Sequence, residues 1–188
     1  MKFTYFALSI TLAMALGLTG CSKPDAPATL AQPYETIAAQ AKGFTVGALM
    51  SAQTVYVLFD PQCPHCGQLW QASAPLQSRV KFMWIPVSII NAKSGRQGAA
   101  LLSAGNPVEA MTAHEKSILA GTGGMSAPDS VPRDIELSIQ KNTALFNSLG
   151  ADSVPYILAR NANTGLVVSN TGALDTLALA GFLGIAAP

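Results

Sequence analysis

The sequence has few charged residues, few cysteines and few histidines, and each shortage excludes a class of protein. Only 11% of the 188 residues are charged, and the net charge is +1 at pH 7. This charge provides no electrostatic basis for binding nucleic acid. Three cysteines, two of them in one motif, are too few for a disulfide-rich scaffold. The apolar fraction of 49% is enough for one domain with its own hydrophobic core.

The same shortage limits metal and cofactor sites. Cys63 and Cys66 form a Cys-x-x-Cys pair, which could be half of a zinc site, but such a site needs two further ligands. Only Cys21, His65 and His114 remain as candidates, and Cys21 belongs to an N-terminal motif. A c-type haem site needs histidine directly after the second cysteine, where this sequence has glycine. We therefore expect no metal and no cofactor, with a zinc site and an inert structural disulfide as the alternatives.

The Cys-x-x-Cys pair lies where a strand is expected to give way to a helix. An apolar run, Val55–Phe59, precedes it, and a helix-like stretch over 67–78 follows. Cys63 is thus expected at a helix N-terminus, where unpaired amides and the helix dipole favour the nucleophilic thiolate. Cys66 falls one turn later on the same face, close enough for a disulfide and better shielded from solvent. The spacing predicts a redox-active pair in which Cys63 is the exposed, ionised member.

Three further residues bear on this pair. His65, between the cysteines, can add a hydrogen bond or partial positive charge to the Cys63 thiolate. Pro64 removes a donor and stiffens the first turn of the helix. His114 falls in a later helix-like stretch, where a single histidine is more often a surface or core residue than a catalyst. We therefore predict Cys63, Cys66 and His65 as the catalytic residues.

The N-terminus has the features of an export signal that ends in a lipidation site. A positive start is followed by an apolar run over 3–18, which is shorter than a membrane-spanning helix. The next residues, Leu-Thr-Gly-Cys at 18–21, look like a bacterial lipobox. We expect residues 1–20 to be a signal peptide and lipidated Cys21 to anchor the protein to a bacterial membrane in the periplasm, where disulfide chemistry is expected. An ordinary signal peptide with a chance cysteine is the alternative.

The remainder of the chain predicts one α/β domain over 44–188, after a tether and linker helix over 21–43. Helices are expected over 33–42, 67–78, 97–103, 107–119, 132–149 and 174–183, and strands over 55–59, 80–90, 156–160 and 166–169. Pro75 is expected to kink or end the helix that follows the cysteines. The strand–helix–strand order around the pair indicates a parallel crossover.

This order resembles the thioredoxin fold, and specifically the catalytic domain of the DsbC/DsbG family. The resemblance rests on the active-site stretch 55–70, a helical insertion over about 91–130, and the stretch 149–155, which looks like the approach to the family's cis-proline. It implies that Pro155 is cis and faces the cysteine pair. It also implies that the backbone of Val154 pairs with a substrate chain. Pro64, Val154 and Pro155 are accordingly the predicted substrate-binding residues.

Two features depart from the usual family pattern. The Cys-Pro-His-Cys sequence, with valine before the proline, resembles the oxidase DsbA more than DsbC or DsbG. The stretch between Cys21 and Val55 is also too short for the N-terminal dimerisation domain that the family usually carries. These departures favour an oxidase over an isomerase and a monomer over a dimer.

We therefore predict a thiol–disulfide oxidoreductase in which Cys63 exchanges with substrate and Cys66 resolves the mixed disulfide. The expected partners are cysteine-containing periplasmic proteins and a membrane redox protein that recycles the pair. The alternatives are a DsbG-type isomerase or reductase, a non-catalytic thioredoxin-fold chaperone or accessory module, and a reductase or metallochaperone that serves one partner. Loss of activity on replacing Cys63 with serine would exclude a pure binding module.

Overall fold

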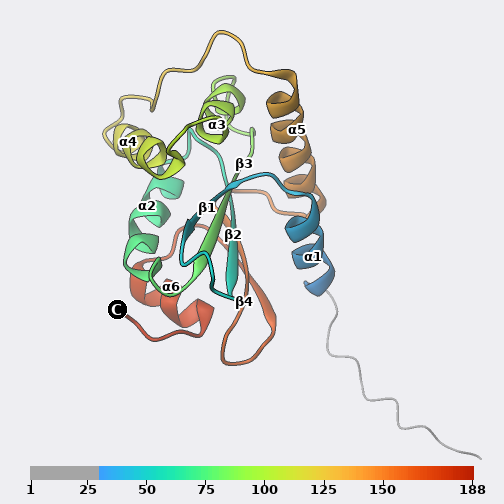
Figure 1. Ribbon diagram of the computed structural model, residues 1–188, viewed down its shortest axis with the longest axis vertical. Helices are drawn as coiled ribbons and strands as arrows, with labels where there is room; N and C mark the ends of the chain where they lie inside the picture. Colours follow the sequence, from blue (N-terminus) through green and yellow to red (C-terminus); the bar gives the residue numbers. More distant parts are fainter. Residues whose placement is uncertain (1–29) are drawn as a thin grey trace, which may run out of the picture.

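The computed structural model describes residues 30–188, which form a five-stranded sheet with helices on both faces (Figure 1). The strands are β1 (Phe44–Gly47), β2 (Thr54–Phe59), β3 (Lys81–Pro86), β4 (Tyr156–Arg160) and β5 (Val167–Thr171). The helices are α1 (Ala31–Gln40), α2 (Pro64–Ser73), α3 (Ser94–Leu102), α4 (Pro107–Leu119), α5 (Arg133–Ser148) and α6 (Thr176–Leu183), and a 3₁₀ helix, η1 (Ala74–Leu76), follows α2. The predicted signal peptide and the predicted lipidation site, Cys21, lie outside the described residues. None of the helices described is both long and apolar enough to span a membrane.

The sheet has the strand order β1-β3-β2-β4-β5. β2 and β3 are parallel, which confirms the predicted crossover through α2, and every other neighbouring pair is antiparallel. At the centre of the sheet, Val57 of β2 lies opposite Trp84 of β3 and Ile157 of β4. All three side chains are buried, because helices cover both faces of the central strands. The active-site loop therefore directly follows β2, the buried central strand of the sheet.

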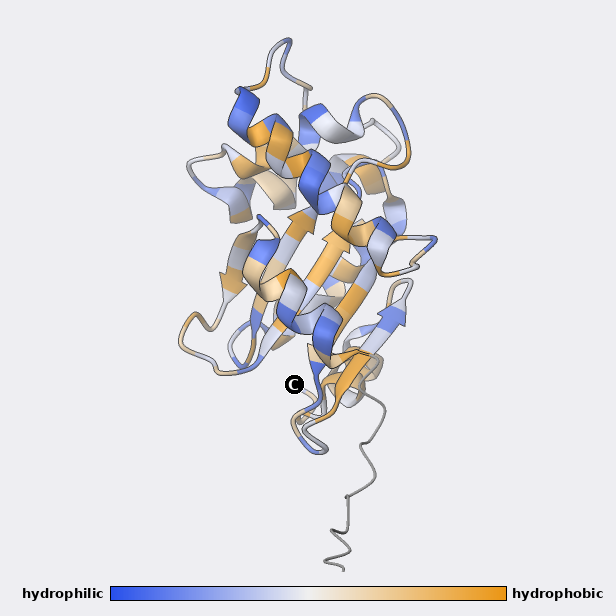
Figure 2. Ribbon diagram, turned by 90° about the vertical axis from the view of Figure 1, so that its right-hand side faces the viewer, coloured by the Kyte–Doolittle hydropathy of each residue, from blue (hydrophilic) through white to orange (hydrophobic). Residues whose placement is uncertain are grey.

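The helices form two layers around the sheet (Figure 1). α1 and α5 cover one face, and α2 and α6 cover the other, with α4 packed beside α2. Figure 2 shows hydrophobic residues concentrated on the central strands and hydrophilic residues interspersed along the helices. Burial of each large apolar side chain in such a core stabilises the fold by about 1.5–3 kcal/mol.

The N-terminal part of the described chain differs from the sequence-based prediction. The helix expected as a linker before residue 44 is α1, and its Ile37 is fully buried in the core. Tyr34 of the same helix packs edge-on against Tyr56, with ring centroids 5.0 Å apart. β1, which follows, was not predicted because its four residues with two inward side chains, Phe44 and Val46, are too short a pattern to recognise. The folded unit therefore includes α1 and begins before residue 44.

The predicted amphipathic helix before the hairpin is confirmed as α5, whose Ile139, Asn142 and Phe146 are buried. Asn142 is the polar member of this stripe. Its side-chain amide donates to the carbonyl oxygens of Lys42 at 2.7 Å and Pro86 at 3.0 Å. The same side chain accepts from the backbone amide of Lys42 at 2.9 Å. These three bonds connect α5 to the chain before β1 and to the end of β3.

The helical insertion lies between β3 and α5, as predicted, and consists of α3 and α4. α4 packs along α2, and Asn106, which directly precedes α4, is its N-cap and accepts from the amide of Glu109 through its side chain. α2 itself ends at Ser73, and Pro75 lies in the 3₁₀ turn that follows, which confirms the predicted break. The insertion is thereby placed directly against the helix that carries the cysteines.

Candidate active site

Cys63 is the N-cap residue of α2, with Pro64 at the first helical position. This confirms the predicted position, because Pro64 and the end of β2 define the junction locally. Cys63 is nevertheless buried, with 5% of its surface exposed, and the prediction of an exposed thiol was wrong in this respect. Cys66 lies one turn further along α2 and is fully buried. The two cysteines are not joined by a disulfide.

The pKa values of the two thiols are shifted in opposite directions. The Cys66 thiol donates a hydrogen bond to the Cys63 sulfur, and this bond is the main reason that the pKa of Cys63 falls to about 6 from an ordinary 9.0. Burial opposes the shift, while the backbone amides of Cys66 and His65 and the positive charge of His65 add to it. Burial raises the pKa of Cys66 well above its ordinary value. Cys63 is therefore the thiolate at neutral pH, and Cys66 stays protonated.

His65 contributes less than the sequence suggested. Its side chain is exposed, and its Nδ1 lies 3.0 Å from Oε1 of Gln68 in the next turn. Its positive charge is the smallest of the causes that lower the pKa of Cys63, after the contributions from Cys66 and the two backbone amides. The stabilising group that sequence analysis overlooked is the partner thiol itself.

The loop before β4 places the backbone of Val154 against Cys63. The peptide bond between them is cis, as the family resemblance implied. The thiol of Cys63 donates to the carbonyl oxygen of Val154 at 3.4 Å, and both groups are buried. Pro64 is exposed beside them. The structure thus brings the Val154–Pro155 peptide to Cys63, although Val154 and Cys63 are 91 residues apart in the sequence.

Asp60 ties the active-site loop to the chain that follows β3. Its side chain is completely buried. One carboxylate oxygen accepts from the amide of Gln62 at 2.8 Å, and the other accepts from the amides of Ile89 at 2.8 Å and Ile90 at 3.0 Å. Asp60 lies within the active-site stretch 55–70 that resembles the DsbC/DsbG family, but two of its partners, Ile89 and Ile90, come from a segment that only the tertiary structure places nearby.

The insertion holds the same loop through a second polar network. The side-chain amide of Gln62 donates to Oε1 of Gln97 in α3 and to the carbonyl oxygen of Gly123. Gln97 in turn donates to the carbonyl oxygens of Gly123 at 2.9 Å and Met125 at 2.6 Å. The loop after α4 is therefore bonded to the residue directly before Cys63.

His114 of α4 is a buried part of this scaffold. Its Nδ1 accepts from the amide of Met125 at 3.0 Å, so Nε2 carries the proton and donates to the carbonyl oxygen of Pro61 at 2.7 Å. Burial lowers the pKa of His114, which keeps the ring neutral. Of the two positions expected for a single histidine, surface or core, His114 has the core position.

The next residue of α4, Glu115, was missed by sequence analysis. It is buried, and its position one turn after Met111 and three residues before Ile118 was the available signal, because all three occupy the inward stripe of α4. A carboxyl group on an apolar stripe is uncommon unless it has a partner or a function.

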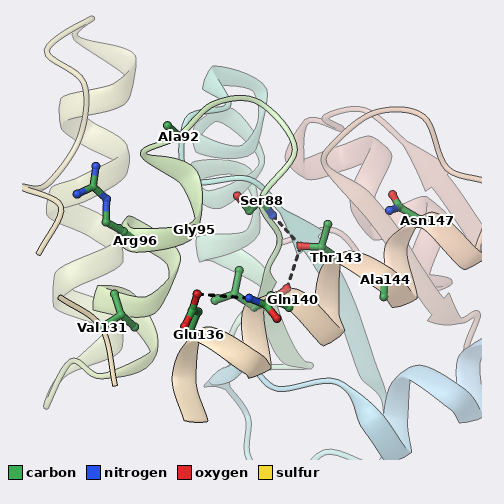
Figure 3. Close-up of a pocket in the computed structure, with 11 residues that line it drawn as sticks. Ser88, Ala92, Gly95, Arg96, Val131, Glu136, Gln140, Thr143, Ala144 and Asn147 are labelled. Atoms are coloured by element: carbon green, nitrogen blue, oxygen red, sulfur yellow. Dashed lines mark hydrogen bonds between the residues drawn. The ribbon is translucent and has the colours of Figure 1, made fainter. Parts of the chain in front are cut away.

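A cavity of about 640 Å³ lies elsewhere, between α3 and α5 (Figure 3). Its lining includes Ser88, Arg96, Glu136 and Thr143, and the Ser88 amide donates to Thr143 Oγ1 at 3.0 Å. No predicted site residue contributes to it. The cavity is therefore separate from the cysteine pair.

Comparison with known proteins agrees with this architecture. The chain is 31% identical to the thiol:disulfide interchange protein DsbG of Pseudomonas aeruginosa over 140 residues, which cover 73% of this chain and 54% of that protein. It is 30% identical to DsbG of Escherichia coli over 55% of this chain and 42% of that protein. The chain therefore spans about half the length of the curated relatives it matches. No family model matches the sequence.

Among solved structures, the catalytic domain of Proteus mirabilis ScsC superposes with a TM-score of 0.64 at 16% identity, covering 82% of this chain and 94% of that one. The sheet order, the Cys-x-x-Cys helix and the cis-proline loop define a thioredoxin-fold protein. With the sequence similarity to DsbG, the predicted resemblance is confirmed, and the described part of the chain is a thioredoxin-fold protein of the DsbC/DsbG family.

Proposed function

We propose that the protein is a thiol–disulfide oxidoreductase that exchanges disulfides with cysteine-containing proteins and acts mainly as an oxidant. The observation that supports this most directly is the asymmetry of the pair. Cys63 caps α2 with a pKa of about 6, next to a fully buried Cys66 and opposite a cis Val154–Pro155 peptide. A low-pKa thiol beside a shielded partner is the arrangement that forms and then resolves a mixed disulfide.

In the oxidative direction, a substrate thiolate attacks the Cys63 sulfur of the Cys63–Cys66 disulfide. A bond forms between the substrate and Cys63, and Cys66 leaves with the electron pair and takes up a proton. A second substrate thiolate then attacks the substrate sulfur of this mixed disulfide, and Cys63 leaves as a stable thiolate. The substrate loses two electrons and two protons, and a membrane redox protein that accepts two electrons from the cysteine pair would restore the disulfide.

The surroundings of Cys63 are suited to an extended protein substrate. The carbonyl oxygen of Val154 accepts from the Cys63 thiol while this thiol is protonated. When Cys63 is ionised or bonded to substrate, this carbonyl is released and can accept from a substrate amide, as in an added β-strand. Ile89 and Ile90 expose apolar side chains although their amides bind Asp60. These two side chains offer a surface for apolar residues of the substrate.

The direction of exchange follows from the stability of the reduced form. A thiolate stabilised at Cys63 lowers the free energy of the reduced protein, so the disulfide is a stronger oxidant. The similarity to proteins named DsbG favours a second candidate, a disulfide isomerase or reductase. The two candidates differ in the reduction potential and in the preferred substrate, which makes them separable by experiment.

Replacing His65 with leucine is expected to make the protein a weaker oxidant. The loss of its charge raises the pKa of Cys63 from about 6, because the thiolate loses one stabilising group. Since the helix amides and Cys66 remain, we expect a rise of at most about one unit, equivalent to about 30 mV toward more reducing potentials. The potential is measured by equilibrating each variant with glutathione buffers and counting free thiols after alkylation.

Gln71→Leu, an exposed position further along α2, is the matched control and should leave the potential unchanged. An equally oxidising His65→Leu protein would contradict the role of His65. Efficient reshuffling of scrambled substrates by the parent protein, combined with poor oxidation of reduced ones, would favour the isomerase.

We further propose that the protein works in the periplasm, attached to a membrane through lipidated Cys21. The apolar run over 3–18 and the lipobox-like residues at 18–21 support this proposal. Replacing Cys21 with alanine is expected to release the protein from the membrane fraction without changing the activity of the purified protein. Retention of the variant in the membrane fraction would contradict the lipid anchor. The predicted monomeric state remains a prediction.

A further inference from the structure

Two consecutive apolar side chains are exposed in the turn between β1 and β2. Leu49 is 63% exposed and Met50 is 98% exposed, so neither contributes to the core. A third, Leu166, is 58% exposed in the hairpin turn between β4 and β5. Single exposed apolar residues are common on protein surfaces, but polar residues are usual at turns. These three residues, the apolar turn residues, have side chains that the fold itself leaves largely in solvent.

Both turns lie at the end of the sheet opposite the cysteine pair. β2 starts at this end with Thr54 and leads to Cys63 at the other end. The side-chain amide of Gln53, which precedes β2, donates to the carbonyl oxygen of Arg160 at 3.0 Å. Arg160 is the last residue of β4 and precedes the hairpin turn that contains Leu166. Since β2 has six residues, the sheet alone separates the two ends by about 20 Å.

The start of α1 lies at the same end as the apolar turn residues. The hydroxyl of Tyr34 donates to the carbonyl oxygen of Thr54 at 3.1 Å, and Glu35 lies 3.5 Å from Arg160. Figure 1 shows the start of α1 and the hairpin after β4 at the lower end of the molecule, with α3 and α4 of the insertion at the upper end. The chain therefore enters the fold at the end that carries the apolar turn residues.

The segment between the proposed lipidation site and the fold is short. Eight residues, 22–29, separate Cys21 from Leu30. Because an extended chain spans at most about 3.6 Å per residue, this segment can hold the start of α1 no more than about 30 Å from the lipidated residue. Of the two ends of the sheet, the one with the apolar turn residues is therefore the one held near the lipid.

The charges at this end nearly balance. Arg79, Lys81 and Arg160 provide three positive charges. The C-terminus lies here too, because Arg79 donates to the carbonyl oxygen of Ala187 at 3.1 Å. Its carboxylate and Glu35, which pairs with Arg160, provide two negative charges. This end does not repel anionic lipids, but a contact with a membrane depends mainly on its apolar side chains.

We propose that the apolar turn residues insert into the interfacial region of the lipid bilayer and hold the anchored domain with Cys63 directed away from the membrane. The inference rests on the proposed lipid anchor at Cys21 and goes beyond it, since an anchor alone leaves the domain free to turn. Insertion of so few apolar groups is weak by itself, but the anchor keeps them at a high local concentration beside the lipid. The cysteine pair then faces the periplasm, from which protein substrates approach.

The test is the quenching of tryptophan fluorescence by brominated lipids. The mature lipidated protein with Met50→Trp is reconstituted in vesicles of phosphatidylethanolamine and phosphatidylglycerol, with and without a dibrominated phosphatidylcholine. A side chain about 5–10 Å deep in the interface lies close to the bromine atoms, so we expect the emission of the introduced indole to fall about twofold. The native Trp70 and Trp84 are buried in the core, so the emission of the parent protein should not change.

Ile90→Trp is the matched control, because Ile90 is exposed at the opposite end of the sheet, where its amide donates to Asp60. It should show no quenching. Because an indole can itself favour the membrane interface, the Met50→Trp protein is also prepared with Leu49→Asp and Leu166→Asp. The two aspartates should abolish the quenching, because a carboxylate is costly to bury in lipid.

Several results would overturn the inference. Equal quenching at positions 50 and 90 would show that the domain has no fixed orientation, and quenching that survives the two aspartates would show that the indole alone causes it. Absence of quenching in a Met50→Trp protein that floats with the vesicles would overturn the orientation and leave the lipid anchor intact. If the indole instead shifts to the blue with rising protein concentration, the turns contact a second copy of the chain. An N-terminal peptide without acyl chains in mass spectrometry would remove the anchor and the inference together.

Discussion

Cys63→Ser is expected to lose disulfide exchange by more than about 1000-fold, because a serine hydroxyl cannot replace the thiolate that forms the mixed disulfide. Cys66→Ser should still react with substrates, since Cys63 remains, but it cannot resolve the product internally. It should therefore accumulate covalent adducts with cysteine-containing substrates. Non-reducing electrophoresis followed by mass spectrometry measures both outcomes, and the adducts should disappear on addition of a reductant.

The pH dependence of the same reaction identifies the group that activates Cys63. Alkylation of the reduced parent should follow the Cys63 thiolate, with a midpoint at pH about 6. Because the hydrogen bond from the Cys66 thiol is the main cause of this low pKa, Cys66→Ala should raise the midpoint toward the ordinary value of 9.0. Cys66→Ser, which retains a donor, should raise it less. Preferential labelling of Cys66 in the parent would show that the two roles are reversed.

Asp60→Ala is expected to destabilise the protein by about 3–5 kcal/mol, because it leaves several buried backbone amides without an acceptor. The carboxylate accepts from the amides of Gln62, Ile89 and Ile90, and no part of it reaches solvent. The loss is measured as the free energy of unfolding in urea at neutral pH. The loop that carries Cys63 depends on these bonds, so a slower exchange reaction should accompany the loss of stability.

Asp129→Ala is the matched control for this prediction. Asp129 is an exposed carboxylate in the loop between α4 and α5, and its replacement should change the stability by no more than about 0.5 kcal/mol. A loss of less than about 1 kcal/mol in Asp60→Ala would show that water or other groups can satisfy the amides. The buried carboxylate would then have no structural role.

Much of the candidate site follows from residues that are neighbours in the sequence. The apolar run of β2, the two cysteines and Pro64 define a strand-to-helix junction over a short segment, and this alone predicts that Cys63 caps a helix. The spacing of the cysteines determines that Cys66 lies one turn further on the same face. The cis bond before Pro155 was reached only through the resemblance to a known family. No local pattern requires it, because most X-Pro bonds are trans.

The fold was predictable to a similar degree. The helices with clear periodicity and the central strands occur close to the expected positions, because a 3.6-residue or continuous apolar pattern identifies one buried face. β1 was not predicted, since four residues contain too little of any pattern. The role of α1 was also misjudged. Its Ile37 and Tyr34 pack against a core that later strands build, so the helix shows only weak amphipathicity in isolation.

Only the tertiary structure decided the electrostatics of the site. Cys63 is buried because the loop of Val154 lies over it, and the partners of Asp60 come from the chain after β3. Glu115 lies against Gly67 of α2 only because α4 of the insertion packs along α2. A residue type and its spacing specify which groups can ionise. The free energy of ionisation depends on how much water and which charges surround the group, and distant segments supply that environment when the chain folds.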